Sequence, residues 1–515
     1  MSFVSSLTHS LRLARAGFVF AREGAFVGVV VADLPPFARP PLALANLIAK
    51  RDVDALTGLS RAIDKLGPSY VKLGQFLSTR PDIVGTKVAL ELERLQDRMT
   101  PMSRQVAIGI IERSFGATID TLFQDFGEPV AAASIAQVHR ASVGAGQGAR
   151  SVAVKVLRAG VERRFARDLA DMIYAAHLAE RIAPELRRFR LVQVVETLAR
   201  TVRMEMDFRL EAAAASEFAE NCEHDPEMRA PAIDWNLTTR EVMTMEWIDG
   251  VPLTDLDRLI QRGFDPPDLA RALIQSFLRR ALRDGFFHAD MHQGNFFVDE
   301  AGGIVAVDFG IMGRLGRKER RFLAEILFGF IRRDYLRVAQ VHFEAGYVPH
   351  VHRVEDFAQA IRAIGEPIHS RTANQISMAK LLTLLFEITA LFDMTTRIEL
   401  VLLQKTMVVV EGVARKLDPQ LNMWSTAEPV VGAWIAENLG PLGRLDDMRR
   451  GVASLAGLIV EAPRRLEEVA GRLDVALTQT TQLEARTTRL ESRLPIYFVG
   501  FAILLSVVAF LWYHW

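Results

Sequence analysis

The chain of 515 residues contains a single cysteine, Cys222. An intrachain disulfide and a metal site built from several cysteines are therefore excluded, and the composition suits a reducing compartment. Neither sign of charge dominates, because 62 Lys and Arg residues balance 62 Asp and Glu residues. The chain thus lacks the excess of basic residues that is typical of nucleic-acid-binding proteins, and we expect no nucleic-acid partner. Hydrophobic residues make up 50% of the chain, which is enough for several globular domains.

Acidic residues are missing from the N-terminus, where none precedes Glu23. Arg12, Arg15 and Arg22 make this stretch basic. A cleaved signal peptide is not indicated, because Arg22 and Glu23 interrupt the apolar run. A mitochondrial transit peptide would fit the Arg and Ser content. A basic amphipathic helix lying on a membrane surface is the simpler interpretation.

Charge is also missing from Ile496 to Trp512. This apolar stretch extends to about 18–20 residues, which is enough to cross a bilayer core of roughly 30 Å. We therefore predict a transmembrane helix over 494–513, with a buried core helix as the alternative. Arginines precede it, and aromatic residues lie at both of its ends, so the bulk of the protein is expected on the cytoplasmic side. Before it, the charged stretch 464–493 predicts a helical stalk, and pairing with a second copy stays open.

The centre of the chain carries two polar motifs that phosphoryl transfer requires. Asp290 is followed five residues later by Asn295, and Asp308 opens an Asp-Phe-Gly triplet after a short apolar strand. Phosphoryl transfer needs a carboxylate that orients the nucleophile and oxygen ligands that hold Mg²⁺. Asp290 would be the first, and Asn295 and Asp308 the second. The alternative is an ordinary polar loop before a buried strand.

Two strands around a glycine turn precede these motifs, and the second carries Lys155 after Val-Ala-Val. A lysine in this place pairs with nucleotide phosphates in kinases. Where kinases have a glycine-rich loop, this chain has Ala-Ala-Ala-Ser, which should stiffen the loop and alter nucleotide handling. Further on, 241–250 reads as a strand and a hinge whose backbone would meet adenine. The predicted nucleotide-binding residues are Ala131, Ala132, Ala133, Ser134, Val138, Lys155, Glu246 and Ile248.

Acidic residues follow in a long stretch, 161–222, that reads as helical. Asp207 and Glu211 are four apart and would share a helix face, with Glu205 pointing elsewhere. One of these acids should pair with Lys155. Near the N-terminus, Lys72 and Gln75 are three apart and would share a face of another helix. Exposure to solvent is the alternative for each of these polar residues.

The segment after Asp308 is too short for a peptide-binding platform. A charged helix start at Arg317 follows almost directly, and no Ala-Pro-Glu motif is present. Ala289 also stands where kinases usually have the arginine that binds an activation-loop phosphate. Both features count against an ordinary Ser/Thr kinase.

Taken together, these motifs resemble the UbiB family of atypical kinases, also called the aarF-domain family, over roughly residues 55–420. The resemblance rests on Lys-x-Gly-Gln at 72–75, Ala-Ala-Ala-Ser-Ile-Ala-Gln-Val-His at 131–139 and Glu-x-Asp at 205–207. It implies an α+β, protein-kinase-like two-lobed fold with an N-terminal helical extension over the site. To it we add the C-terminal transmembrane helix.

The resemblance also implies roles for single residues. Lys155 and Glu211 would be the ion pair between the lobes, and Asp290 would be the catalytic-loop aspartate. Lys72 and Gln75 would lie against Glu205 and Asp207, where a protein substrate would otherwise enter. Two departures, Met291 and Gln293, stand where relatives often have proline, and they should loosen the catalytic loop.

The expected domains are the extension with its Lys-x-Gly-Gln motif (1–100), the N-lobe with inserted helices (101–250), the C-lobe (251–420), the stalk (421–493) and the membrane helix (494–513). The resemblance implies an ATPase that uses ATP or ADP with Mg²⁺ and supports ubiquinone biosynthesis at the bacterial inner membrane. Its partners would be membrane lipids, prenylphenol intermediates and ubiquinone biosynthesis proteins, and a homodimer stays open. A lipid or small-molecule phosphotransferase and a nucleotide-binding pseudokinase scaffold are the alternatives.

Overall fold

The computed structural model of the chain describes residues 3–27, 39–50, 55–78, 84–92, 95, 100–144, 148–182, 187, 189–369, 388, 391–394 and 398–439. Within these ranges, no helix has both the length and the apolar composition that crossing a membrane requires. The predicted membrane span at 494–513 lies outside the described residues, as does the predicted stalk beyond residue 439.

The N-terminal extension is helical in its described part. Its elements are α1 (Phe3–Arg22), α2 (Arg39–Ile48), α3 (Ala55–Leu66), α4 (Pro68–Ser78) and α6 (Thr86–Leu92). Gly67, at φ 94°, makes the sharp turn between α3 and α4, and Pro68 suits the first turn of α4. A Cβ atom at Gly74 would lie 2.4 Å from Cδ1 of Leu95, so a larger residue there would require that side chain to move.

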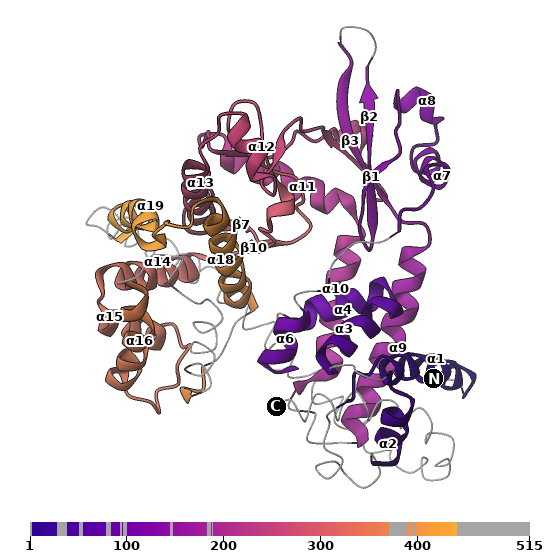
Figure 1. Ribbon diagram of the computed structural model, residues 1–515, viewed down its shortest axis with the longest axis horizontal. Helices are drawn as coiled ribbons and strands as arrows, with labels where there is room; N and C mark the ends of the chain where they lie inside the picture. Colours follow the sequence, from indigo (N-terminus) through magenta and orange to yellow (C-terminus); the bar gives the residue numbers. More distant parts are fainter. Residues whose placement is uncertain are drawn as a thin grey trace, which may run out of the picture.

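An antiparallel sheet forms the N-lobe, in the order β1 (Pro129–Ala132), β2 (Ala136–Val143), β3 (Arg150–Leu157) and β5 (Val242–Glu246). α7 (Arg104–Phe115) and α8 (Ile119–Leu122) lie beside one face (Figure 1). On that face, Ile111 packs with Val152 and Val154 of β3. Ala153 and Leu157 of the same strand pack on the opposite face, as the alternation of side chains along a strand requires.

Three helices cover the other face: α9 (Val161–Ile182), α10 (Leu191–Glu205) and α11 (Phe208–Cys222). The prediction of one long helical stretch is wrong at the junction of α10 and α11. Asp207 has an extended backbone, and its side chain accepts a hydrogen bond from the N–H of Arg209, so it caps a new helix. The break separates Glu205, which ends α10, from Glu211, which lies in the first turn of α11.

The C-lobe combines small sheets with a helical bundle. One sheet has the order β4 (Met228–Arg229), β9 (Ile304–Ala306), β8 (Phe296–Val298), β6 (Val251–Pro252), and β7 (Phe286–His288) pairs with β10 (Met312–Arg314). The helices are α12 (Leu256–Gln261), α13 (Pro266–Arg279), α14 (Arg317–Arg332), α15 (Tyr335–Glu344), α16 (Val354–His369), α18 (Ile398–Leu417) and α19 (Met423–Leu439). Three short turns complete the described elements: η4 (Trp235–Leu237), the π-helical η5 (Arg280–Asp284) and η6 (Gln293–Asn295).

The C-lobe core extends into two neighbouring parts of the chain. Ala215 and Phe218 of α11 belong to it, so this helix joins the two lobes. Ala427 and Val431 of α19 belong to it as well. The first part of the predicted stalk is therefore a helix packed on the C-lobe.

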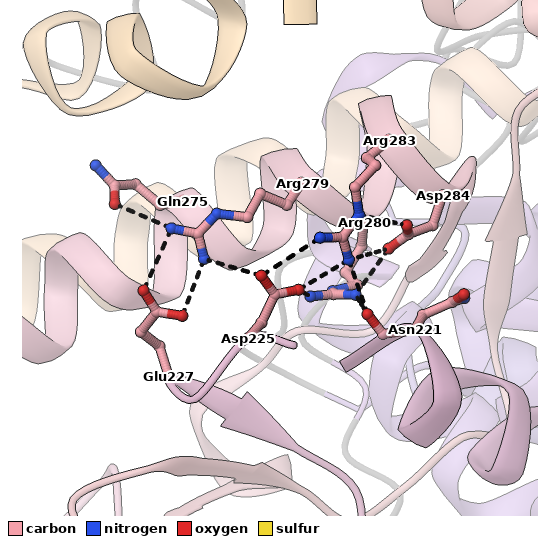
Figure 2. A network of polar contacts seen from close by, with 8 residues as sticks. All are labelled: Asn221, Asp225, Glu227, Gln275, Arg279, Arg280, Arg283 and Asp284. Atoms are coloured by element: carbon pink, nitrogen blue, oxygen red, sulfur yellow. Dashed lines mark hydrogen bonds and ion pairs between the residues drawn. The ribbon is translucent and has the colours of Figure 1, made fainter. Parts of the chain in front are cut away.

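A partly buried charge network, with Arg280 at its centre, fixes the end of α11 to η5 (Figure 2). Arg280, whose side chain is 1% exposed, binds the carboxylates of Asp225 and Asp284 and the carbonyl oxygen of Asn221. Arg283 donates to Oδ2 of Asp225 at 2.8 Å and to the same carbonyl oxygen at 2.7 Å. These contacts give partners to both Nη atoms of Arg280 and offset part of the penalty of burying its guanidinium, while its Nε has no hydrogen-bond partner among the described residues.

The network continues along α13. Arg279 binds Glu227 through two hydrogen bonds of 3.1 and 3.3 Å, and its Nη1 lies 3.8 Å from Oδ1 of Asp225. Three arginines thus meet three acids: Asp225, Glu227 and Asp284. This cluster, Arg279–Arg280–Arg283 with its three acids, is called the Arg280 cluster below. Because it holds both the end of α11 and the segment before β4, it ties α11 to the C-lobe.

Candidate functional site

Lys155 lies in the middle of β3, with Val138 of β2 and Met243 of β5 beside it in register. Its ammonium nitrogen is 2.6 Å from Oε1 of Glu211 and 3.5 Å from Oδ1 of Asp308. The structure therefore brings together side chains from the N-lobe sheet, α11 and the Asp-Phe-Gly triplet. Asp207, the other candidate partner of Lys155, pairs with Arg209 instead.

The three charged groups shift one another's proton affinity. Burial alone would lower the pKa of Lys155, but the carboxylates of Asp308 and Glu211 outweigh it and raise that pKa. Burial, with Asp308 adding repulsion, raises the pKa of Glu211 from 4.5 to about 7 despite the attraction of Lys155. Burial opposes ionisation of Asp308, yet Lys155 lowers its pKa overall. Two acids thus share one ammonium, and the more buried acid holds a proton more strongly.

The raised pKa of Glu211 predicts a pH dependence of stability. Between pH 4.5 and about 7 the folded chain keeps a proton that the unfolded chain has released. The free energy of unfolding should then fall as pH rises through this window, by at most about 1.4 kcal/mol per pH unit. Asp308 adds no slope there, since its lowered pKa lies below the window. In nucleotide-free protein, Glu211→Gln should remove this part of the slope in thermal unfolding. Parallel pH profiles of the two proteins would contradict the assignment.

His288 connects the two polar motifs. Its Nδ1 accepts a hydrogen bond of 3.1 Å from the N–H of Asp290, so we assign the ring proton to Nε2. Nε2 then donates to the carbonyl oxygen of Asp308. Burial lowers the pKa of His288, which favours this neutral form. The backbone positions of Asp290 and Asp308 are therefore fixed relative to each other.

Asp290 has a half-buried carboxylate, 46% exposed, while Asn295 is buried. The side-chain N–H of Asn295 donates to the carbonyl oxygen of Asp290 at 3.1 Å. Its Oδ1 is then the side-chain atom that can coordinate a cation. The N–H of Gly310 donates to Oδ1 of Asp308 at 3.1 Å and orients that carboxylate.

The donor set fits Mg²⁺ better than a structural metal. Among the described residues, no group of three or more His, Cys, Asp or Glu side chains is placed to hold a metal ion. A cation here would have Asp308 and Asn295 as protein ligands, and its other ligands would be water and phosphate oxygens. Mg²⁺ is commonly bound by one or two carboxylates plus substrate phosphates.

α18 contacts the catalytic loop, which the sequence did not reveal. The buried hydroxyl of Thr406 lies 2.7 Å from the carbonyl oxygen of Leu402 and 3.1 Å from that of Ala289, so its one proton is shared between its own helix and the loop. Lys416 donates to Oε1 of Gln293 at 3.2 Å. Met291 is 1% exposed and belongs to the C-lobe core. The two residues that were expected to loosen this loop are thus both engaged in contacts.

The remaining predicted nucleotide residues lie along the N-lobe sheet and its exit. Ala131 and Ala132 are in β1, Ala133 and Ser134 form the turn into β2, and Ser134 is fully buried. Ala131 pairs with Val138, which itself pairs with Lys155, so the loop lies one strand away from the lysine.

At the exit from β5, Glu246 uses its carboxylate to bind Arg229 of β4 at 3.0 Å. Ile248, two residues further, is half-buried. The side chain of Glu246 thus links the segment between the lobes to β4. Any contact with a nucleotide there would be made by the backbone. The segment after Gly310 is short, because β10 leads directly into α14 at Arg317.

The extension reaches the N-lobe through Lys72 of α4. Its ammonium nitrogen is 2.8 Å from Oε2 of Glu205, and these side chains are only 12% and 8% exposed. Gln75 is half-buried on the same helix. Asp207 is not part of this contact, because its carboxylate caps α11 and binds Arg209 at 2.7 and 2.9 Å. The structure thus forms one of the two expected links between the Lys-x-Gly-Gln and Glu-x-Asp motifs.

The comparisons with known proteins agree with this arrangement. Residues 94–342 match the family model described as the ABC1 atypical kinase-like domain, and residues 361–422 match the UbiB helical domain. The solved structure described as the complex of Rv3197 and erythromycin from Mycobacterium tuberculosis covers 71% of this chain and 93% of its own, at 24% identity and a TM-score of 0.50. That similarity concerns the fold alone, which is protein-kinase-like.

Two relatives match most of the chain. The probable protein kinase UbiB of Marinobacter nauticus is 38% identical over 493 residues, which cover 94% of this chain and 88% of the relative. The probable protein kinase UbiB of Azotobacter vinelandii is 40% identical over 417 residues, which cover 80% and 77%. The resemblance found in the sequence motifs is confirmed, and the chain belongs to the UbiB family of atypical kinase-like proteins.

Proposed function

We propose that the chain is a membrane-anchored atypical kinase or ATPase that binds Mg-ATP and supports ubiquinone biosynthesis. The observation that carries this proposal is the contact of Lys155 with both Glu211 and Asp308. Asp290 and Asn295 are linked to the same site through His288. The relatives' name, probable protein kinase UbiB, supports a kinase-type enzyme. The connection with ubiquinone synthesis is what membership of the UbiB family implies.

In this proposal each charged side chain of the site has a separate role. Lys155, held protonated by its two acids, binds phosphate oxygens as a point charge. Glu211 positions the ammonium, and the half-exposed carboxylate of Asp290 orients the attacking hydroxyl or water and accepts its proton. Asp308 and Asn295 would hold Mg²⁺, which when bound neutralises phosphate charge. The backbone near Glu246 and Ile248 would contact the adenine, and the alanine loop at 131–134 would cover the phosphates.

The substrate side of the proposal rests on what surrounds the site. Lys72 and Glu205 join the extension to the N-lobe through a buried ion pair, and the segment after Gly310 offers no long platform for a peptide. These two residues, with Gln75 on the same helix as Lys72 and Asp207 at the start of α11, would regulate access and exclude protein substrates. Prenyl-lipid intermediates, or the biosynthetic complex itself, are then the proposed targets. The proposed location is the bacterial inner membrane, with 494–513 as a single C-terminal anchor and the bulk of the protein cytoplasmic.

Product analysis tests this function. Purified full chain would be incubated with Mg-ATP, with and without vesicles containing a prenylphenol. We expect release of inorganic phosphate, enhanced by the vesicles, without a phosphorylated lipid. A phosphorylated prenylphenol or phospholipid would replace the ATPase with a lipid phosphotransferase, which the short segment after Gly310 also suits. Nucleotide binding without turnover would leave a pseudokinase scaffold.

A further inference from the structure

Exposed apolar side chains gather on the first two helices. Of the sixteen large hydrophobic residues that are exposed in the described part of the chain, six lie on α1 and α2. On α1 these are Leu7, Leu11 and Phe18, and on α2 they are Leu44, Leu47 and Ile48. Their exposed fractions are 44%, 62% and 50%, and then 60%, 82% and 37%. Scattered apolar residues are normal on a protein surface, but such a concentration marks an interaction site.

The spacing places these side chains on one face of each helix. Leu7, Leu11 and Phe18 are four and seven residues apart, and Leu44, Leu47 and Ile48 are three and one apart, as on one side of a helix. These six residues are called the α1–α2 apolar face. The two helices contact each other and lie near the lower right end of the molecule in Figure 1.

The opposite side of α1 packs against the rest of the protein. Leu13 and Ala16 are buried, and His9 and Arg12 bind the carboxylate of Asp171 in α9 at 2.5 and 2.7 Å. These contacts fix the rotation of α1 about its axis. The exposed face therefore points outward because the helix is anchored, and not because it is unattached.

The charge on this face is of one sign. Arg15 and Arg22 are exposed and continue the line of Leu7, Leu11 and Phe18 at helical spacing. α1 contains no acidic residue, and Glu23, which follows it, is 1% exposed and neutralised by Lys50 and Lys65 at 2.8 and 2.6 Å. Arginine binds phosphate groups, while leucine and phenylalanine enter the acyl boundary of a bilayer.

We propose that the α1–α2 apolar face binds the surface of an anionic phospholipid bilayer. A second copy of this chain fits less well, because a symmetric contact would bring Arg15 and Arg22 of one copy onto the same face of the other. Binding there would hold the helical extension, including α4 with Lys72, close to the bilayer. This inference depends neither on nucleotide chemistry nor on the proposed C-terminal anchor.

Site-directed fluorescence tests the proposal on the full chain. Cys222 is the only cysteine and is 5% exposed, so Cys222→Ala gives a background for labelling. A polarity-sensitive probe would be attached through Leu11→Cys, and for comparison through Leu336→Cys on α15, which is 48% exposed. With phosphatidylglycerol-containing vesicles we expect at least a two-fold rise and a blue shift in emission at position 11. Position 336 should not respond, although any C-terminal anchor would hold both proteins on the same vesicles.

Three outcomes would overturn the proposal. One is equal emission at position 11 with and without anionic vesicles. The second is an equal response at position 336. The third is a concentration-dependent blue shift without vesicles, which would indicate a second copy as the occupant. Adding Arg15→Glu and Arg22→Glu should abolish the response at position 11. An unchanged response would show that these arginines do not bind the phosphate groups of the lipid.

Discussion

Asp308→Asn is expected to abolish the magnesium-dependent binding of ATP. A neutral amide is a poorer Mg²⁺ ligand than a carboxylate. The substitution also removes one of the two acids that hold Lys155 protonated. For the parent protein, ligand at 100 times its Kd stabilises the fold by about 2.7 kcal/mol, and the variant should lose nearly all of this gain. Thermal unfolding with ATP, in the presence and absence of Mg²⁺, measures it.

The same variant should fold normally, because Asp308 is 46% exposed and its amide replacement has the same shape. Its unfolding temperature without ligand is therefore the internal control. Losing one acid should also lower the pKa of Glu211, since Asp308 helps to raise it. An unchanged magnesium-dependent shift in the variant would show that Asp308 does not bind the metal.

Asp225→Asn is expected to destabilise the protein by about 3–5 kcal/mol, the usual cost of removing one partner from a buried ion pair. Asp225 is 9% exposed and binds both Arg280 and Arg283. Without its charge, the Arg280 cluster would keep three arginines but only two acids. Chemical denaturation of the purified protein measures the loss. Asp268→Asn is the control, because its ion pair with Arg271 is more than half exposed and worth at most about 1 kcal/mol.

The same substitution should also weaken nucleotide binding from a distance. The cluster fixes the carbonyl oxygen of Asn221 near the end of α11, and the same helix carries Glu211 in its first turn.

Combining Asp225→Asn with Arg283→Met restores the balance of charge and should recover part of the stability. If Asp225→Asn unfolds like the parent protein, the Asp225 carboxylate does not stabilise the fold. If the double variant is no more stable than Asp225→Asn alone, charge imbalance in the cluster is not the cause of the lost stability.

Local motifs in the sequence indicate which residues converge on the site. Lys155 follows Val-Ala-Val in a strand, and Asp290, Asn295 and Asp308 keep the spacing that phosphoryl transfer requires. Strand register and short loops then leave little freedom, so these side chains meet as the motifs imply. Helical spacing alone left open which acid pairs with Lys155. The family resemblance implied Glu211 for Lys155 and Glu205 for Lys72, and both contacts are present, with the cap at Asp207 between the two acids.

Contacts between distant segments left no signal in the sequence. Thr406 supports Ala289 across 117 positions, and Arg280 reaches Asp225 across 55. Each depends on how helices pack, and neither residue belongs to a motif. Met291 illustrates the consequence: it was expected to loosen the catalytic loop, yet it is buried in the C-lobe core.

Phosphate release by the Asp290→Asn variant tests most directly whether this site turns over Mg-ATP. The full chain and the variant would be compared at saturating Mg-ATP in the same vesicles. We expect turnover to fall by about 10²–10⁴-fold, the range for loss of a general base, while ATP affinity is kept. Equal turnover in the two proteins would contradict it.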